Sequence, residues 1–430
     1  MRRFHISDPG FEAGFNAFVE ERRDTPRDVD AIVADVLAAV RAEGLGALLR
    51  FAREFDKVEI DETNIRVSEA EIEAGFAACA PEVREAIAFA AARIRAYHER
   101  QRPADQWFKD EAGVELGWRW TALEAVGVYV PGGRAAYPST VLMNTVPAAA
   151  AGVPRIAMVT PPGRLQPAVL AAAKVAGVTE IWRVGGAQAV AALAYGAGPI
   201  APVDKIVGPG NAFVTAAKRR VYGAVGIDAL AGPSEIVVVA DSANDPQWIA
   251  ADLLSQAEHD PAAQSILITD DEAFAAKVEA AVQEQLGQLA TGEDAAASWR
   301  DHGAVVIAPR EASARLVDLI APEHVELAVE DPDALAAQIR HAGAIFLGRH
   351  TPEAVGDYVA GSNHVLPTSR AARFSSGLSL YDFLKRTSIV KCDPGAFAVL
   401  GPHTVALAEA EGLPAHARSA AIRLGRSRSS

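Results

Sequence analysis

Two alternating patterns of apolar positions run along the chain and predict an α/β fold. Short runs rich in Val and Ile alternate with Ala-rich stretches whose apolar positions recur at helical spacing. Strand runs separated by crossover helices are typical of parallel sheets. The runs form two series, first RIAMVT, EIWRVGG, DKIVGPG and SEIVVVA, then SILITD, AVVIAP, VELAVE and AIFLG.

Helices are predicted to dominate both ends of the chain. In the first hundred residues the predicted segments are 26–55, 69–79 behind a Ser68–Glu71 capping box, and Pro81 to Arg100. From about residue 380 the pattern indicates a helical tail without a strand partner of its own. We expect this tail to pack on another domain or another subunit.

The length of 430 residues favours two α/β domains with smaller attachments, because single cores rarely grow beyond roughly 250–300 residues. The expected fold class is α/β, with two Rossmann-like parallel-sheet domains, one inserted in the other, plus a small helical tail. The expected ranges are 21–128 with 237–379 for the discontinuous domain, 129–236 for the inserted domain, and 1–20 with 380–430 for the tail region. A strand near residue 115 is expected to begin the sheet of the discontinuous domain.

Composition and charge exclude several classes. A net charge of −14 and a pI near 5.3 disfavour nucleic acid as the main partner, because phosphate binding needs a clustered basic surface. The start MRRFHISDPGF lacks the apolar stretch of a secretory signal, and Pro and Gly interrupt the Ala-rich runs before they could span a bilayer. Cys79 and Cys392 are isolated, which fits neither a disulfide framework nor a thiolate metal site. We therefore expect a cytoplasmic protein without a membrane segment.

Gln256 and His259 are candidate metal ligands. Asp245 and Pro246 predict the start of a helix through WIAADLLSQAEHD, and the three-residue spacing puts Gln256 and His259 on one face of its last turn. Together these side chains could bind one ion. Alternatively, His259 is only a favourable partner of the helix dipole near the helix end.

Glu323 and His324 in PEHVEL are candidates for general acid/base chemistry. An imidazole titrates near neutrality, and a carboxylate can order a water or orient the ring. Pro322 is expected to start a turn or helix that leaves both side chains free of strand pairing. The alternative is a solvated capping Glu beside a surface His.

Two segments punctuated by Gly and Pro present further candidates. GDYVAGSNHVLPT at 356–368 is interpreted as a loop that presents Asp357, Asn363 and His364, and such loops often carry function. EGLPAH at 411–416 would aim Glu411 and His416 outward from the helical tail. A simple turn is the alternative for both segments.

Three glycine turns follow predicted strands of the inserted domain: VPGG at 130–133, VGGAQA at 184–189 and IVGPGN at 206–211. Backbone amides at a helix start behind such a turn suit a pyrophosphate. The last turn is not a GxGxxG fingerprint, because Phe213 stands at the third Gly position, and no acid for a ribose is evident. Three such turns in one α/β domain favour a ligand crevice at its strand ends.

Taken in order, the motifs of the chain resemble the histidinol dehydrogenase family over nearly the whole length. They are GVYVPGG, YPSTVLMN, RVGGAQAVAALAYG, KIVGPGN, AGPSE, LLSQAEHD, PEHVEL, GDYVAGSNHVLPT, RFSSGLSLYDFLKR and EGLPAH. The resemblance implies a zinc- and NAD-dependent dehydrogenase of histidine biosynthesis. Its reaction would oxidise L-histidinol through L-histidinaldehyde to L-histidine with two NAD⁺.

The resemblance also implies the roles of individual residues. One zinc ion per subunit would be bound by Gln256, His259 and Asp357, with His416 supplied across the interface of a homodimer, so the tail would serve in dimerisation. His324 would act as general base and Glu323 would activate water. The implied substrate-binding residues are Ser234, Gln256, His259, His324, Asp357, Glu411 and His416, and the implied NAD-binding residues are Tyr129, Gln188 and Asn211. The inserted domain would bind NAD, and the discontinuous domain would carry the metal and acid/base residues.

Other functions stay open at this point. Relatives of the same fold oxidise other polyols. In a zinc hydrolase, Glu323 and metal-bound water would attack an ester or amide, but the three glycine turns would have no use. In a non-catalytic NAD-sensing or structural dimer, replacing Glu323 or His324 would leave function intact. A thiol-dependent aldehyde dehydrogenase needs a positioned Cys, and neither Cys79 nor Cys392 is well placed.

Overall fold

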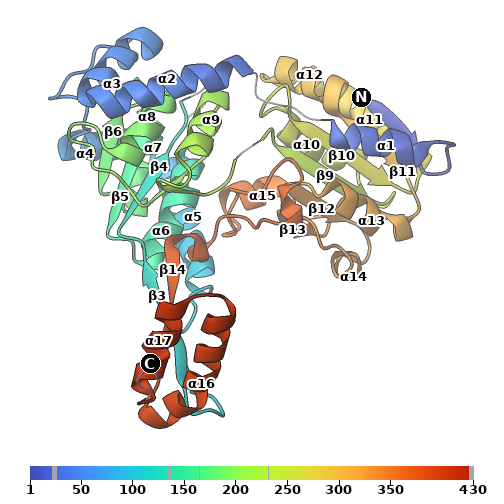
Figure 1. Ribbon diagram of the computed structural model, residues 1–430. Helices are drawn as coiled ribbons and strands as arrows, with labels where there is room; N and C mark the ends of the chain where they lie inside the picture. Colours follow the sequence, from blue (N-terminus) through green and yellow to red (C-terminus); the bar gives the residue numbers. More distant parts are fainter. Residues whose placement is uncertain (22–26, 133–136, 164, 231, 426–430) are drawn as a thin grey trace. The chain divides into compact units, whose positions relative to one another are not determined.

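The computed structural model describes residues 1–21, 27–132, 137–163, 165–230 and 232–425 (Figure 1). The chain forms two compact units, one made of Met1–Gln101 with Leu123–Phe383 and the other of Arg102–Ala122 with Leu384–Ser430. Among the described residues, no helix is long and apolar enough to cross a bilayer.

A five-stranded, all-parallel sheet lies in the first unit. Its strands are β4 (Ala125–Tyr129), β5 (Arg155–Thr160), β6 (Glu180–Arg183), β7 (Lys205–Val207) and β8 (Gly226–Ile227), in the order β6-β5-β4-β7-β8. The chain winds outward from β4 in one direction and then from β7 in the other, as in a Rossmann-like fold. The runs RIAMVT, EIWRVGG and DKIVGPG form β5, β6 and β7 as predicted, and β8 has no predicted run. The grouping of SEIVVVA with them is wrong, because that run forms β9 of the six-stranded sheet.

Helices cover this sheet on both faces. One face shares a core with α2 (Arg27–Glu43), α3 (Leu45–Phe51), α8 (Gly186–Tyr195) and α9 (Ala212–Val221). Helices α4 (Glu69–Ala78), α5 (Pro81–Glu99), α6 (Pro138–Ala151) and α7 (Pro167–Ala176) pack on one another. The predicted capping box is confirmed, since Ser68 Oγ accepts from the Glu71 N–H and the Glu71 carboxylate accepts from the Ser68 N–H.

A six-stranded, all-parallel sheet also lies in the first unit. Its strands are β1 (Arg2–His5), β9 (Glu235–Ala240), β10 (Gln264–Thr269), β11 (Ala304–Ile307), β12 (His324–Ala328) and β13 (Ala344–Leu347), in the order β1-β11-β10-β9-β12-β13. Alternate residues of β9 point to opposite cores: Val237 and Val239 pack with α1 (Phe11–Glu20) and α13 (Arg310–Ile320), whereas Ile236 and Val238 pack with α10 (Pro246–Ala257), α11 (Glu272–Leu286) and α12 (Gly292–His302). The short helices α14 (Pro332–Ala336) and α15 (Glu353–Tyr358) flank β13 in sequence.

The second unit combines a small antiparallel sheet with two helices. Strands β2 (Gln106–Lys109), β3 (Glu115–Ala122) and β14 (Leu384–Lys391) pair in the order β14-β3-β2, and α16 (Pro394–Ala410) packs on α17 (Pro414–Arg423).

Two expectations about this region are wrong. The strand near residue 115 does not begin the six-stranded sheet, because β3 hydrogen-bonds to β2 and β14 instead. The tail is not purely helical, because β14 pairs with β3 along its whole length. RTSIV holds two apolar residues, Ile389 and Val390, which are adjacent rather than alternating, so the segment gives little strand signal in the sequence.

Candidate active site

The candidate site lies where two neighbouring strands of the six-stranded sheet begin, an end called here the amino edge. β12 pairs with β9 so that His324, its first residue, lies beside Ile236. Ser234 and Glu235 stand at the start of β9, and Glu323 directly precedes β12. The strand order reverses between β9 and β12, because β10 and β11 lie on one side and β13 on the other. Residues distant in sequence therefore meet at this point.

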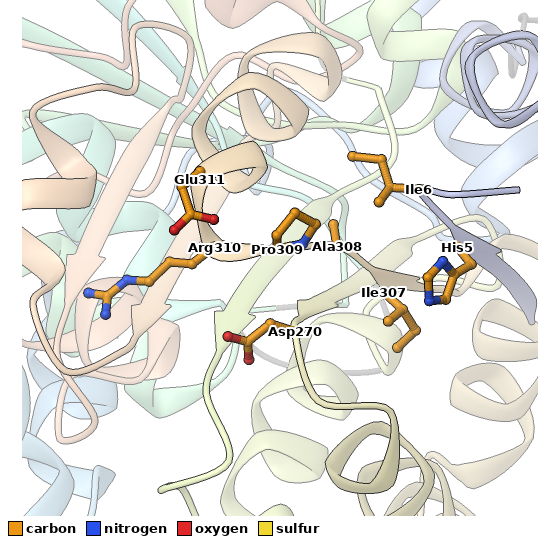
Figure 2. A pocket seen from close by; sticks show the side chains of 8 residues that line it. All are labelled: His5, Ile6, Asp270, Ile307, Ala308, Pro309, Arg310 and Glu311. Atoms are coloured by element: carbon orange, nitrogen blue, oxygen red, sulfur yellow. The ribbon is translucent and has the colours of Figure 1, made fainter.

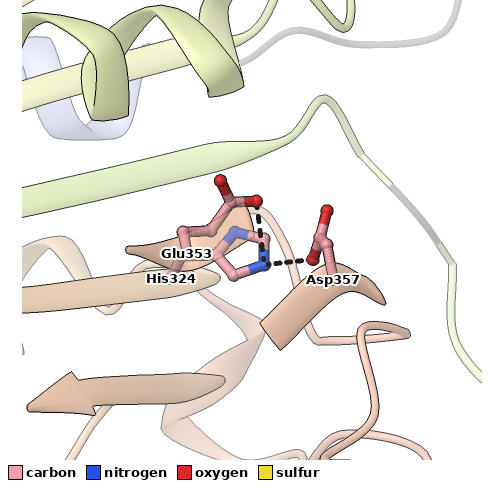
Figure 3. Close-up of side chains that lie close together, drawn as sticks. All are labelled: His324, Glu353 and Asp357. Atoms are coloured by element: carbon pink, nitrogen blue, oxygen red, sulfur yellow. Dashed lines mark ion pairs between the residues drawn. The ribbon is translucent and has the colours of Figure 1, made fainter. Parts of the chain in front are cut away.

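His324 is the centre of the cluster. Its Nδ1 lies 2.9 Å from Gln256 Oε1 and 3.2 Å from the carbonyl oxygen of Glu235. Both partners are acceptors, so Nδ1 donates and carries a proton. Nε2 lies 3.7 Å from Asp357 Oδ1 and 3.9 Å from Glu353 Oε1 (Figure 3). The ring therefore presents Nε2 to a group of carboxylates.

The ring and the carboxylates shift one another's protonation. Burial alone would lower the pKa of His324, but Glu323, Asp357 and Glu353 outweigh burial and raise that pKa to about 10. Burial raises the pKa of Glu323 to about 7, although His324 acts in the opposite direction. Burial would also raise the pKa of Asp357, but His324 and His364 lower it to about 2. Asp357 is therefore ionised and available to a cation.

Glu353 belongs to the cluster although the sequence analysis does not single it out. It begins α15 one helical turn before Asp357, so both carboxylates face His324 (Figure 3). Glu353 Oε2 accepts from Ser255 Oγ at 3.0 Å, whereas Oε1 is buried without a hydrogen-bond partner. Burial raises the pKa of Glu353 to about 8, and Asp357 adds to the shift. The four-residue spacing of Glu353 and Asp357 is the sequence signal that could have found it.

Two local predictions at the site are wrong. Asp357 lies on α15 and not in a loop, because that helix continues through Tyr358 before the glycine-rich segment begins. Pro322 does not free the next two side chains from strand pairing. The Pro322 and Glu323 carbonyls accept from backbone N–H groups at the start of β13, so His324 enters the sheet at once and both acid/base candidates are buried. The solvated alternative for Glu323 and His324 is therefore wrong.

Gln256 and His259 lie at the end of α10 that points to the amino edge. The predicted cap is confirmed, since Asp245 accepts from the Gln247 N–H and Pro246 is the first helical residue. Gln256 is buried in the last turn, and His259 is exposed just beyond the helix end, with its N–H donating to the Gln256 carbonyl at 3.2 Å. The charge of His259 contributes to the lowered pKa of Asp357, so the side chains of His259 and Asp357 lie close enough to interact.

The donor atoms fit a divalent cation. Glu353 Oε1 is buried without a hydrogen-bond partner, a costly arrangement that a bound cation would relieve. Carboxylate, amide and imidazole donors together suit zinc. Within the described part of the chain, His324, Glu353 and Asp357 offer ligand atoms that all lie within 4.8 Å of one another. This group shares only Asp357 with the ligand set implied by the family resemblance.

The segment after α15 places its two other candidates differently. Asn363 is buried, its Nδ2 donates to the Met143 carbonyl at 2.7 Å, and its Oδ1 accepts from the Val365 N–H at 2.9 Å. These bonds leave Asn363 a structural role. His364 Nδ1 lies 3.9 Å from Asp357 Oδ1, and burial lowers the pKa of His364 although Asp357 opposes that effect. His364 therefore belongs to the cluster and Asn363 does not.

The residues implied for NAD lie at the other end of the strands in the five-stranded sheet. Tyr129 ends β4, and its hydroxyl accepts from the Gly186 N–H at 3.0 Å. Gln188 is buried in the first turn of α8, and Asn211 Oδ1 caps α9 by accepting from two N–H groups of its first turn at 3.1 and 3.2 Å. β4 and β7 adjoin at the strand-order reversal, the usual place of a ligand crevice. Gly133 of the VPGG turn lies outside the described residues.

Of the remaining implied residues, Ser234 lies at the amino edge and the other two lie on the second unit. Ser234 is half-buried, and its carbonyl accepts from the Gln264 N–H at 2.9 Å at the start of β9 and β10. Glu411 directly follows α16 and His416 lies on α17, both exposed on the second unit.

A pocket of about 340 Å³ lies at the opposite, carboxyl edge of the six-stranded sheet (Figure 2). It is lined by His5, Ile6, Asp270, Ile307, Ala308, Pro309, Arg310 and Glu311. None of the residues implied for catalysis, metal or cofactor lines it.

Comparison with known proteins identifies relatives along the whole chain. Residues 19–424 match the family model described as histidinol dehydrogenase. The chain is 78% identical over 424 residues to the histidinol dehydrogenase of Caulobacter vibrioides, covering 99% of both chains, and 60% identical over 429 residues to that of Rhodospirillum rubrum, again covering 99% of both. Its fold matches the crystal structure of histidinol dehydrogenase from Elizabethkingia anophelis with a TM-score of 0.94 and 36% identity, covering 99% of this chain and 98% of that one.

Proposed function

Because the chain belongs to the histidinol dehydrogenase family, we propose that it oxidises L-histidinol through L-histidinaldehyde to L-histidine with two NAD⁺, in histidine biosynthesis. It is an NAD-dependent oxidoreductase, and its family uses NAD and zinc. The observation that best supports this chemistry is the buried His324 ring, whose Nδ1 is held by two acceptors while Nε2 faces carboxylates.

Gln256, His259 and Asp357 would hold the zinc ion, together with His416 of the partner subunit. Bound there, zinc would supply orientation by ligating nitrogen atoms of the substrate. The ionised Asp357 supports this assignment. Glu353 would not bind the ion itself. It would hold His324 and Asp357 in position, because its Oε1 faces the ring of one and the carboxylate of the other.

In the metal-free chain the facing carboxylates keep the His324 ring protonated, because they raise its pKa to about 10. A cation held by Asp357 would offset that negative charge, so His324 would take the hydroxyl proton of histidinol at Nε2 as hydride leaves the carbon for NAD⁺. Its Nδ1 bonds keep the ring in one orientation during this transfer. The facing carboxylates stabilise the imidazolium that results. In the second oxidation the same atom would take a proton from the hydrated aldehyde.

Glu323 would activate the water that adds to histidinaldehyde. Burial raises its pKa to about 7, so the carboxylate can both accept a proton from water and release it again near neutral pH. Its Oε2 accepts from the Glu235 N–H at 3.1 Å, which orients the carboxylate and leaves Oε1 for the water.

Substrate binding would involve Ser234 and, across the interface of a homodimer, Glu411 of the partner subunit. A carboxylate there suits the cationic amino group of histidinol. Tyr129, Gln188 and Asn211 of the inserted segment 129–236 would bind NAD. If the partner supplies Glu411 and His416, an isolated monomer is inactive. We propose a cytoplasmic location.

The test is NADH formation from L-histidinol, counted per substrate consumed, before and after metal chelation and again after zinc is restored. Two NADH per histidinol, lost on chelation and recovered with zinc, support the proposal. No turnover by the zinc-loaded dimer would overturn it. Turnover of an ester or amide without NADH would favour a hydrolase.

A further inference from the structure

A buried ion pair binds the backbone of the third glycine turn, IVGPGN at 206–211, which follows β7 of the five-stranded sheet. Lys218 lies on α9 and Asp228 directly follows β8, and both side chains are 4% exposed. Lys218 Nζ contacts Asp228 Oδ1 and also donates to the Gly208 carbonyl at 3.0 Å. The Gly208 N–H donates to Asp228 Oδ2 at 2.8 Å. Both backbone polar groups of Gly208 are thus bound by one pair of opposite charges.

The backbone at Gly208 needs this support because its conformation is unusual. Its φ of +112° lies in the region that side chains disfavour, and a Cβ there would stand 2.1 Å from the Tyr129 carbonyl oxygen. The turn therefore passes directly against the end of β4, where the strand order of the sheet reverses.

The turn leads straight into Asn211, which begins α9. Asn211 Oδ1 is used to cap the helix, so its amide NH₂ is the part left to donate to a ligand. Lys218 lies two turns along the same helix and reaches back to Gly208. The pair consequently fixes both the turn and the helix start relative to each other.

Stability alone explains such a pair poorly. Taking two charges out of water costs about as much as their attraction returns, and apolar replacements of similar size are often neutral. A buried pair on a backbone turn is better explained by the geometry that it enforces.

We propose that Lys218 and Asp228 are positioning residues for the dinucleotide, acting through the Gly208 turn and Asn211. This inference rests on the NAD site proposed above. Both side chains bond the Gly208 backbone, so their loss should act on NAD⁺ binding through the turn and should leave zinc and histidinol binding at the amino edge of the other sheet unchanged.

The experiment uses zinc-loaded, full-length dimer and measures NAD⁺ affinity by titration calorimetry, zinc content, histidinol KM and melting temperature. Lys218→Met should weaken NAD⁺ binding about tenfold, roughly the effect of one positioned hydrogen bond, and should lower the melting temperature because Asp228 stays buried and uncompensated. The double variant Lys218→Met with Asp228→Asn removes both charges. It should regain melting temperature while NAD⁺ binding stays weak.

The matched control is Arg155→Met. Arg155 pairs with Glu180 and donates to the carbonyls of Ala201 and Pro202, but at the amino edge of the same sheet. It should leave NAD⁺ affinity unchanged.

If the double variant recovers both NAD⁺ affinity and melting temperature, the pair has only a structural role and the inference fails. The inference also fails if Arg155→Met weakens NAD⁺ binding as much as Lys218→Met does. If the unaltered protein forms NADH from histidinol but Lys218→Met binds NAD⁺ normally, the inference alone fails. Absence of NAD⁺ binding by the unaltered protein would overturn both proposals.

Discussion

The two parallel sheets reverse their strand order in the same way, yet their candidate functional residues stand at opposite edges. In the five-stranded sheet Tyr129 and the Gly208 turn follow the carboxyl ends of β4 and β7. In the six-stranded sheet Glu323 and His324 stand at the amino ends of β12 and its neighbour β9. Topology alone therefore locates the point of reversal but does not choose the edge.

The charges of the proposed ligands fit this difference between the edges. Crossover helices run against the strands, so their positive N-terminal ends gather at the carboxyl edge and their negative C-terminal ends at the amino edge. Helices α8 and α9 begin beside the residues implied for the anionic dinucleotide. Helix α10 ends beside Gln256 and His259, where a cation is proposed. The ionised, half-buried carboxylate of Asp357 adds to the negative potential there.

Glu323→Gln tests the amino edge most severely. The amide cannot take a proton from water, so histidinaldehyde oxidation should fall by about 10²–10⁴-fold while NAD⁺ affinity is unchanged. Steady-state NADH formation from the aldehyde measures the first quantity and calorimetry the second. Unaltered aldehyde oxidation would remove Glu323 from the chemistry, and a parallel loss of NAD⁺ binding would show that the two edges are not independent.

Asp357→Asn should weaken zinc binding by more than the roughly 10–100-fold that loss of an outer-shell partner costs, since it replaces a proposed direct ligand that is ionised in the folded chain. Zinc retained after dialysis against a graded chelator measures this change. Gln256→Glu is the counterpart that adds charge at the same edge and should retain zinc. If Asp357→Asn keeps its zinc but loses NAD⁺, the cation does not belong at the amino edge.

Glu326→Gln should alter the pH dependence of stability. Burial and Asp252 raise the pKa of Glu326 from 4.5 to about 9. The folded chain then binds more protons than the unfolded chain between these pH values, so the free energy of unfolding falls as pH rises across that window. The variant should show a shallower slope, because Glu323 and Glu353 also bind excess protons in the folded chain, and it should have a higher free energy of unfolding at pH 8, measured by urea unfolding of metal-free protein.

The exposed Glu311, at the carboxyl edge of the same sheet (Figure 2), supplies the control for that experiment. Glu311→Gln should keep the slope of the unaltered protein. An unchanged slope in Glu326→Gln would mean that other buried carboxylates, and not Glu326, bind the excess protons.

Tyr129→Phe should have the smallest effect. It removes the acceptor of the Gly186 N–H but no charge, so NAD⁺ affinity should fall only a few-fold, in line with about 1 kcal/mol for one neutral hydrogen bond. Histidinol KM at saturating NAD⁺ should not move. A change in histidinol KM larger than the change in NAD⁺ affinity would contradict the separation of the two edges.

Much of the fold could be predicted because its signals are local. Runs such as SEIVVVA and SILITD form the central strands β9 and β10, and the caps at Ser68 and Asp245 are as expected. The pairing of β3 with β14 could not be predicted, since it joins distant, weakly patterned segments whose register depends on tertiary contacts.

The candidate site divides in the same way. The place of Gln256 in the last turn of a helix could be predicted, because the cap and apolar spacing of α10 are local signals. The burial of Glu323 and His324 could not, because it depends on β9 and β13, which pair with β12 from distant parts of the chain. Glu353 lacks a motif of its own, and only the helical conformation of α15 brings it beside Asp357. The roles of these residues came from family resemblance rather than from spacing.

The second unit is built from two segments that lie far apart in the chain, and this has a consequence for synthesis on the ribosome. Ala122 of β3 pairs with Leu384 of β14, so about 260 residues must be added after β3 emerges, which takes on the order of tens of seconds at typical elongation rates. During that interval β3 has only the short β2 beside it, and a two-stranded hairpin is marginally stable alone. The nascent chain thus carries an open strand edge for most of its translation, and a ribosome that stalls before residue 384 releases a product with that edge still uncovered.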